Sequence, residues 1–180
     1  ESKEQLSDSS APPIRQVSIG VGDNAIKVGG ETVMFRHEKT FFNKPGFAIL
    51  ITTDMDDDEI QKRFSKLGYL QYERVGQVLK PELVALKDTG NREKFLAIVK
   101  KACNEPYGIM LMSGNLDTMR AALDISKENK PLIYAATLDN CEAFGSLAKE
   151  YSCPIAVKGQ GLEGVSVLTD KLAGMGLKDI

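Results

Sequence analysis

The sequence predicts an α/β domain in which short buried strands alternate with amphipathic helices. From Phe47 onward, five short apolar runs are each followed by a stretch whose apolar residues recur with helical spacing. Glycine, asparagine and aspartate separate these runs, as they do in the loops of βα units. A β-patterned segment, residues 14–46, precedes the first apolar run. Five βα units in series indicate a mostly parallel sheet with right-handed crossovers.

The chain divides into three parts along its length. Residues 1–13 are rich in serine and charge and end in two prolines, which is typical of a linker or tail. Residues 14–46 alternate apolar and polar side chains around glycine-containing turns, which predicts an antiparallel β-hairpin arm. Residues 47–180 are expected to hold the βα units. Within them, the pattern of residues 69–80 is ambiguous.

The helices are expected to begin at residues that cap helix N-termini. Asp54 is expected to cap the first helix, Asn115 the third, and Asp139 or Asn140 the fourth. The acidic run 56–59 is expected in the first turn of the first helix, where negative charge complements the helix dipole without any metal ion. The five predicted strands span residues 48–52, 83–86, 109–112, 132–135 and 155–157.

Two architectures fit five βα units. An open, five-stranded, doubly wound sheet would be complete at 180 residues. A (β/α)₈ TIM barrel needs roughly 250 residues, so residues 47–180 would be its first five units. Residues 177–180 follow a helix-stopping glycine and have the pattern of the opening of a sixth strand. This last feature favours the partial barrel, preceded by the β-hairpin arm.

Composition excludes several classes of function. A net charge of −2 and a pI near 5.6 argue against a nucleic-acid or anionic membrane surface. The sequence has no apolar run of the ~20 residues that a membrane span needs, and we do not expect residues 1–13, which lack an apolar core, to be a signal peptide. Cys103, Cys141 and Cys153 are widely spaced without a CxxC pair, so we expect buried thiols in a reducing cytoplasm rather than disulfides or a metal site.

Polar residues that follow the predicted strands are candidates for a binding site. They are Asp54, Asp88, Ser113, Asn115, Thr137, Asp139, Asn140 and Lys158. In parallel sheets such residues converge on one edge, where they can hydrogen-bond a pterin-like or anionic ligand. Asn115, Asp139 and Lys158 are the cofactor-binding candidates, although each also has a capping or turn explanation. The sequence has no Ser/His/Asp order, no HExxH and no Walker loop, so we assign no catalytic residue and no metal ligand.

Two further features have structural explanations. Residues 159–164 match GxGxxG, but they follow the last predicted strand, and the acidic residue expected ~20 positions later would lie past Ile180. A glycine-rich βα loop is therefore favoured over a dinucleotide site. His37 is the only histidine. Because it lies on the arm, before the first parallel strand, we expect it to have a surface or packing role.

Three segments resemble the large (gamma) subunit of the corrinoid iron–sulfur protein, from the acetyl-CoA decarbonylase/synthase, or carbon monoxide dehydrogenase, system. They are VGGETVMFRHEKTFFNKPG at 28–46, YERVG at 72–76 and PELVALK at 81–87. The resemblance covers roughly residues 11–180 and implies a [4Fe–4S] module, a central barrel like dihydropteroate synthase, and a corrinoid module. It also implies three partners: the small subunit, a pterin/folate methyltransferase and acetyl-CoA synthase.

This sequence departs from the family pattern because the cluster cysteines and the corrinoid module are absent from it. What remains resembles the linker and the first five units of the central barrel. The hypothesis is therefore a part of the methyl-carrying subunit that serves as scaffold and subunit interface and holds no cofactor itself. Two alternatives are a pterin-binding methyltransferase barrel and a flavodoxin-like module that binds a small ligand.

Overall fold

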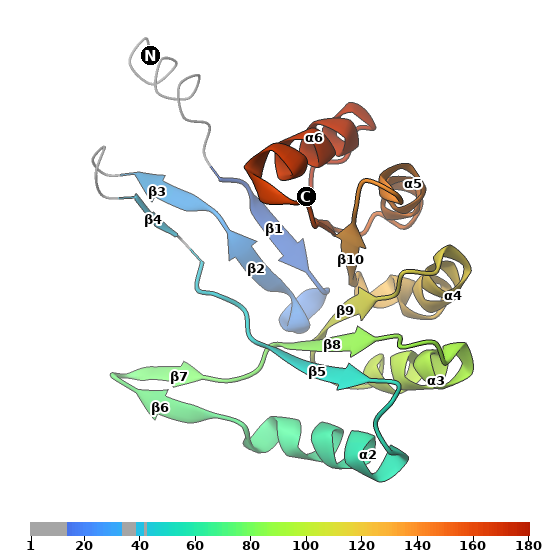
Figure 1. Ribbon diagram of the computed structural model, residues 1–180. Coiled ribbons are helices and arrows are strands. Elements are labelled where there is room, and N and C mark those ends of the chain that lie inside the picture. The colour runs from blue at the N-terminus through green and yellow to red at the C-terminus, as the bar shows by residue number, and fades with distance from the viewer. Residues whose placement is uncertain (1–13, 34–38, 42) are drawn as a thin grey trace.

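The computed structural model describes residues 14–33, 39–41 and 43–180, and it describes side chains for 14–30 and 43–180. A five-stranded parallel sheet forms the centre (Figure 1). Its strands are β5 (Ala48–Thr52), β8 (Leu83–Lys87), β9 (Gly108–Met112), β10 (Leu132–Ala136) and β11 (Ile155–Val157). They lie side by side in the order β5-β8-β9-β10-β11, so each strand pairs with the strand of the next βα unit. The predicted α/β class with a parallel sheet is confirmed.

The helices follow the strands in the same order. They are α2 (Asp57–Lys66), α3 (Arg92–Ala102), α4 (Leu116–Ser126), α5 (Cys141–Tyr151) and α6 (Gly161–Gly174). α3 contacts α4, α4 contacts α5, and α5 contacts α6, along one side of the sheet (Figure 1). A doubly wound sheet needs a reversal of strand order, with helices on both faces. The five described strands show no such reversal, so their order favours the barrel over the doubly wound alternative.

The core lies between the sheet and these helices. Every second residue of a strand faces the helices, as the pleat requires. Seven of these strand residues are at most 1% exposed: Ile51, Val84, Leu86, Ile109, Leu111, Ile133 and Ile155. Phe95 of α3, Met119 and Leu123 of α4, and Phe144 of α5 pack against them and are equally buried. None of the helices in the described part of the chain has both the length and the apolar content to cross a membrane.

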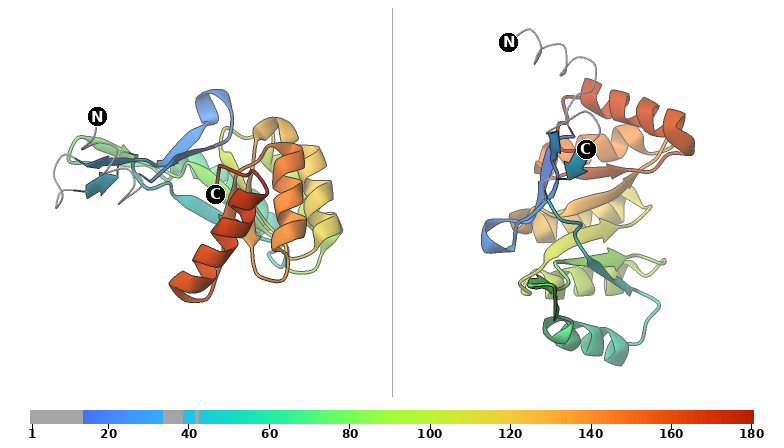
Figure 2. Two further views of the ribbon diagram at one scale, coloured as in Figure 1. Left: turned by 90° about the horizontal axis from the view of Figure 1, so that it is seen from above. Right: turned by 90° about the vertical axis from the view of Figure 1, so that its left-hand side faces the viewer.

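Antiparallel hairpins lie at the amino ends of the parallel strands. β1 (Gln16–Ile19) pairs with β2 (Ile26–Gly29), and β3 (Glu31–Val33) pairs with β4 (Lys39–Phe41). Gly108 opens β9 so close to the first hairpin that a Cβ there would lie 3.0 Å from Ile26 Cδ1 and 2.8 Å from Leu83 Cδ2. Figure 2 shows these hairpins on the opposite side of the molecule from the yellow and orange helices α4 and α5.

The ambiguous stretch forms a third hairpin, β6 (Tyr72–Arg74) with β7 (Gln77–Leu79), after the short 3₁₀ turn η2 (Leu67–Tyr69). Its two turn residues, Val75 and Gly76, both have positive φ, at 51° and 72°. Two-residue hairpin turns of this kind favour Asn-Gly or Asp-Gly, because valine is strained at positive φ. The usual turn signal is therefore missing from the sequence.

Residues 177–180 lie beside β11 at its amino end. The Ile155 N–H donates a 3.0 Å hydrogen bond to the Asp179 carbonyl, and Leu177 and Ile180 pack against the core. The segment is not assigned as a strand. It nevertheless occupies the position next to β11 that the predicted sixth strand requires.

Candidate functional site

The predicted polar residues lie on one edge of the sheet, which we call the carboxyl edge: the residues that follow the carboxyl ends of the five parallel strands. Asn115 lies in the loop after β9, Asp139 in the loop after β10, and Lys158 in the loop after β11. The three candidates therefore stand on consecutive loops of the same edge. Ligand binding by these three residues stays a prediction.

A chain of hydrogen bonds joins the loops that follow β8 and β9. Ser113 Oγ donates to Asp88 Oδ2 at 2.9 Å and accepts from the Asn115 N–H at 3.2 Å. Asn115 Oδ1 in turn accepts from the Thr118 N–H at 2.9 Å, so Asn115 is the N-cap of α4, as predicted. The remaining carboxylate oxygen of Asp88 accepts from the Gly90 N–H at 2.8 Å. These side chains stabilise the loops through bonds to one another.

A second set of bonds joins the loops after β5 and β8. The Thr53 and Thr89 hydroxyl oxygens lie 2.7 Å apart, and Thr53 Oγ1 also accepts from the Thr89 N–H at 2.9 Å. Thr53 is only 4% exposed. Because the side chain is buried and hydrogen-bonded twice to one neighbour, it fixes the relative position of the two loops.

Asp54 does not cap α2, so that prediction is wrong; the N-cap is Asp56. The Met55 N–H donates to the Thr52 carbonyl at 3.3 Å and forms a turn that delays the helix by two residues. The Asp54 carboxylate instead accepts a hydrogen bond from the Thr52 hydroxyl. This bond is the main cause that lowers the pKa of Asp54, and a backbone N–H and the positive charges of Lys87 and Lys94 lower it further. The other acids, 57–59, lie in the first turn of α2 as predicted.

In the loops after β10 and β11, the Asn140 side chain bonds to the backbone, whereas the Asp139 and Lys158 side chains are exposed. Asn140 Oδ1 accepts from the Thr137 N–H at 2.6 Å, and Asn140 Nδ2 donates to the Ala135 carbonyl at 3.4 Å. The N-cap of α5 is Asn140, without a side-chain capping bond. The Lys158 N–H donates to the Ala136 carbonyl at 2.8 Å, while the Lys158 side chain is exposed. Asp139 is exposed in the turn before Asn140.

The glycine-rich loop packs closely on α6. A Cβ on Gly159 would lie 2.6 Å from both the Gly164 carbonyl carbon and the Val165 nitrogen. The first and last glycines of the GxGxxG pattern therefore allow the loop backbone to contact the helix backbone. The geometry gives these two glycines a packing role.

The three cysteines are free thiols on separate elements. Cys141 begins α5 and Cys153 precedes β11, and both are buried; Cys103 follows α3 and is half-buried. Burial raises the pKa of Cys103, and it raises the pKa of Cys153 to about 11. Neutral thiols are poor metal ligands. Within the described residues, no three His, Cys, Asp or Glu side chains are grouped to hold a metal ion. His37 lies outside the described residues.

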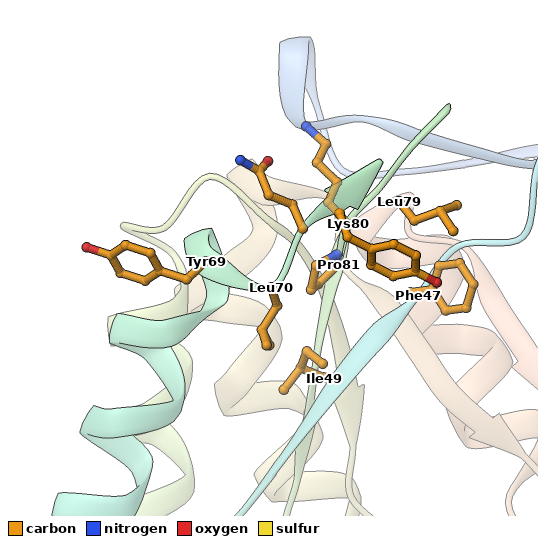
Figure 3. Close-up of a pocket in the computed structure, with 9 residues that line it drawn as sticks. Phe47, Ile49, Tyr69, Leu70, Leu79, Lys80 and Pro81 are labelled. Atoms are coloured by element: carbon orange, nitrogen blue, oxygen red, sulfur yellow. The ribbon is translucent and has the colours of Figure 1, made fainter. Parts of the chain in front are cut away.

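The structure also has an apolar groove that sequence reasoning missed. It has a volume of about 460 Å³ and lies beside β5, between η2 and the β6–β7 hairpin. Phe47, Ile49, Leu70, Leu79 and Pro81 supply apolar lining, whereas Tyr69 points away from the others (Figure 3). β5 is one of the two edge strands of the sheet, and no other described strand pairs with its outer side.

Known proteins resemble almost the whole chain. Residues 16–180 match the family described as CO dehydrogenase/acetyl-CoA synthase delta subunit. The gamma 2 subunit of the acetyl-CoA decarbonylase/synthase complex from Methanosarcina thermophila is 40% identical over 172 residues, which are 94% of this chain and 37% of that protein. The corrinoid/iron–sulfur protein large subunit of Moorella thermoacetica is 36% identical over 180 residues, which are 99% of this chain and 40% of that protein.

A third relative, the gamma subunit of the complex from Methanopyrus kandleri, is 39% identical over 166 residues, which are 91% of this chain and 36% of that protein. The chain therefore spans about two fifths of the length of these relatives. The resemblance predicted from residues 28–46, 72–76 and 81–87 is confirmed. By its match over residues 16–180, the chain belongs to the CO dehydrogenase/acetyl-CoA synthase delta-subunit family.

Proposed function

We propose that this chain is part of the methyl-carrying corrinoid iron–sulfur protein, in which it supplies scaffold and subunit interface. The whole protein would carry a methyl group from a methyl-tetrahydropterin/folate methyltransferase to acetyl-CoA synthase, together with the small subunit as partner. The identity of 36–40% with gamma and large subunits over more than nine tenths of the chain supports this proposal most directly.

We further propose that residues 47–180 are the first five units of a (β/α)₈ barrel of the dihydropteroate-synthase type. The sequential strand order and the helices along one side support a barrel, because a closed barrel needs both. Three more βα units would place a last strand beside β5 and cover the apolar groove at Phe47 and Ile49. The segment at Asp179 would continue as the sixth strand.

Adding those three units tests the barrel. A chain extended through the last unit should melt at a higher temperature and associate less than the 180-residue chain, because the open edge of β5 would be paired. Thermal melts and sedimentation velocity measure the two properties. An unchanged melting temperature and unchanged association would contradict barrel closure.

The cofactors of the whole protein belong, in this proposal, to other parts of the polypeptide. A [4Fe–4S] cluster takes four cysteine thiolates, whereas this sequence has three cysteines, on three separate elements. Burial raises the pKa of two of them, which opposes the thiolate form. The residues present therefore do not fit a cluster, and we assign neither the cluster nor the corrinoid to this chain.

The bonding at the carboxyl edge supports a scaffold role rather than pterin binding. Asn115, Asp88 and Ser113 already bond to one another and to backbone N–H groups. In the full-length protein, we expect Asn115→Ala, Asp139→Ala and Lys158→Ala to leave the methyl-transfer rate within a few-fold of the unmutated protein. A lost hydrogen bond to a bound pterin would instead cost about 1–3 kcal/mol, or roughly 5- to 150-fold in affinity.

Titration of a methylated pterin into the protein separates these two functions. We expect no binding that calorimetry can measure. Micromolar binding that Asn115→Ala abolishes, with the helix content of the variant unchanged by circular dichroism, would replace the scaffold proposal with a pterin-binding barrel.

A further inference from the structure

A second cavity lies at the opposite end of the sheet from the carboxyl edge, and we call it the amino-end cavity. Its volume is about 380 Å³. Four cationic side chains from four separate segments line it: Arg15, Lys130, Lys149 and Lys178. Arg15 precedes β1, Lys130 precedes β10, Lys149 lies on α5, and Lys178 follows α6. Among the described residues, Asp179 is the one carboxylate that lines the cavity.

The positive charge in this cavity is poorly compensated. Asp179 contacts two of the cations: its Oδ1 lies 3.5 Å from Arg15 Nη2 and its Oδ2 lies 3.7 Å from Lys130 Nζ. Lys149 Nζ donates to the Met175 carbonyl at 3.0 Å, and a carbonyl does not cancel its charge. The four cations therefore exceed the lining carboxylate by three charges, in a chain whose net charge is −2.

Glu150, which follows Lys149 in the sequence, and Asp124 are bonded to other groups. Both Glu150 carboxylate oxygens accept from Arg120 Nη1, at 2.8 and 3.0 Å. Asp124 Oδ1 accepts from the Tyr151 hydroxyl at 2.6 Å. Neither acid lines the cavity, so these pairs leave its excess positive charge uncompensated.

We propose that the amino-end cavity binds a compact, multivalent oxyanion, with the charge density of a pyrophosphate group or a small polycarboxylate. Guanidinium and ammonium groups are the side chains that bind such oxygens, Arg15 through its planar fork and the lysines as point charges. Asp179 competes with the ligand, because it holds Arg15 and Lys130 in the ligand-free cavity. This site is independent of the proposed methyl-carrier function, since it is defined by residues away from the carboxyl edge.

The role of Asp179 gives a test with opposite signs. Lys149→Gln and Lys178→Gln each remove an attractive charge, so each should weaken anion binding by about 3- to 10-fold at low ionic strength. Asp179→Asn removes the competing carboxylate and should tighten binding by a similar factor. If Asp179 served only to hold β1 against the segment after α6, Asp179→Asn would lower the melting temperature of the chain without tightening anion binding.

Isothermal titration calorimetry on the full 180-residue chain measures these effects, with inorganic pyrophosphate and citrate as separate probes at matched ionic strength. Lys100→Gln is the matched control, because Lys100 is an exposed lysine of α3 that does not line the cavity. The expected result is saturable binding, opposite shifts for the lysine and Asp179 variants, and no shift for Lys100→Gln. The tighter of the two probes identifies phosphate or carboxylate as the natural group.

Three results would overturn the site. They are an absence of binding by both probes up to millimolar concentration, equal weakening by Lys100→Gln, or weaker binding by Asp179→Asn. Circular dichroism verifies that each variant is folded. Lys178 is exposed, so Lys178→Gln keeps the test decisive even if a change at Lys149 disturbs α5.

Discussion

The polar side chains at the two ends of the parallel sheet differ in how they are bonded. At the carboxyl edge, Asp88, Ser113 and Asn115 bond to one another and to backbone N–H groups. At the amino-end cavity, Asp179 is the one carboxylate of the described part of the chain that compensates the excess cationic charge. A barrel enzyme usually has its reactive groups at the carboxyl edge. Here the less satisfied set of charges is at the other end, which is why we place the further binding site there.

Packing differs between the two ends as well. Glycine substitutions measure this difference, and they have the largest expected effect on stability. A Cβ on Gly159, at the carboxyl edge, would lie 2.6 Å from backbone atoms of Gly164 and Val165, which cannot move without displacing α6. A Cβ on Gly108, at the amino end, would come closest to the ends of the Leu83 and Ile26 side chains, with the Glu82 carbonyl oxygen at an ordinary contact distance of 3.5 Å. We expect Gly159→Ala to lower the free energy of unfolding by about 3 kcal/mol and Gly108→Ala by about 1 kcal/mol.

Urea denaturation of the two variants measures both changes. Gly114→Ala serves as the control, because a Cβ there meets no atom within 4 Å. Equal destabilisation by Gly159→Ala and Gly108→Ala would show that the loop after β11 is not held against α6 as the structure describes.

The hydrogen-bond chain at the carboxyl edge should have a smaller but measurable effect on stability. Ser113→Ala removes one bond to Asp88 and one to the Asn115 N–H, and Ser113 is only 5% exposed. We expect the free energy of unfolding to fall by about 1–2 kcal/mol. The matched control is Ser146→Ala, because exposed Ser146 bonds only to the Glu142 carbonyl of its own helix. A similar loss in both variants would mean that the chain of bonds contributes nothing specific.

Local patterns in the sequence predicted most of the fold. The strand from Leu83 and the cap at Asn115 were predictable, because buried strands are apolar runs and capping needs only one residue and the N–H three positions on. The strand order was predicted only as one of two alternatives, since periodicity does not say which strands pair. The β6–β7 hairpin was missed because Val75 lacks the side chain that favours a turn with positive φ.

The sites were less predictable than the fold. Topology alone predicts that the residues of the carboxyl edge lie together, because parallel strands all end on the same side. It does not reveal that Asp54 accepts from Thr52 instead of capping α2. The amino-end cavity has no local signal at all: its cations are separated by up to 163 positions, from Arg15 to Lys178. A sequence pattern of fixed spacing does not detect such a site.

The smallest expected effect is the pH dependence that Asp54 adds at the carboxyl edge. The folded-state pKa of Asp54 lies below the ordinary value of 3.8, first because of the Thr52 hydroxyl bond and then because of its backbone bond and Lys87. A lowered folded-state pKa means that the ionised carboxylate favours the folded state. This contribution is therefore complete above the unfolded-state pKa and is lost as the pH falls below 3.8 through the folded-state value.

Thr52→Val removes the hydroxyl that lowers the pKa of Asp54 most, so the pKa should rise toward its ordinary value while the strand that contains Thr52 stays intact. Carboxyl ¹³C chemical shifts of Asp54, followed by NMR between about pH 2 and pH 6, report this pKa directly. The control is Thr169→Val, because Thr169 donates to the Val165 carbonyl on α6 and has no contact with Asp54. If Thr52→Val leaves the titration of Asp54 unchanged, the lowered pKa arises from the backbone hydrogen bond of Asp54 and from the two lysines instead. Salt then separates these two causes: where the lysines dominate, Asp54→Asn reduces the stability difference between acidic and neutral pH only at low salt, because the charges of Lys87 and Lys94 are poorly screened there.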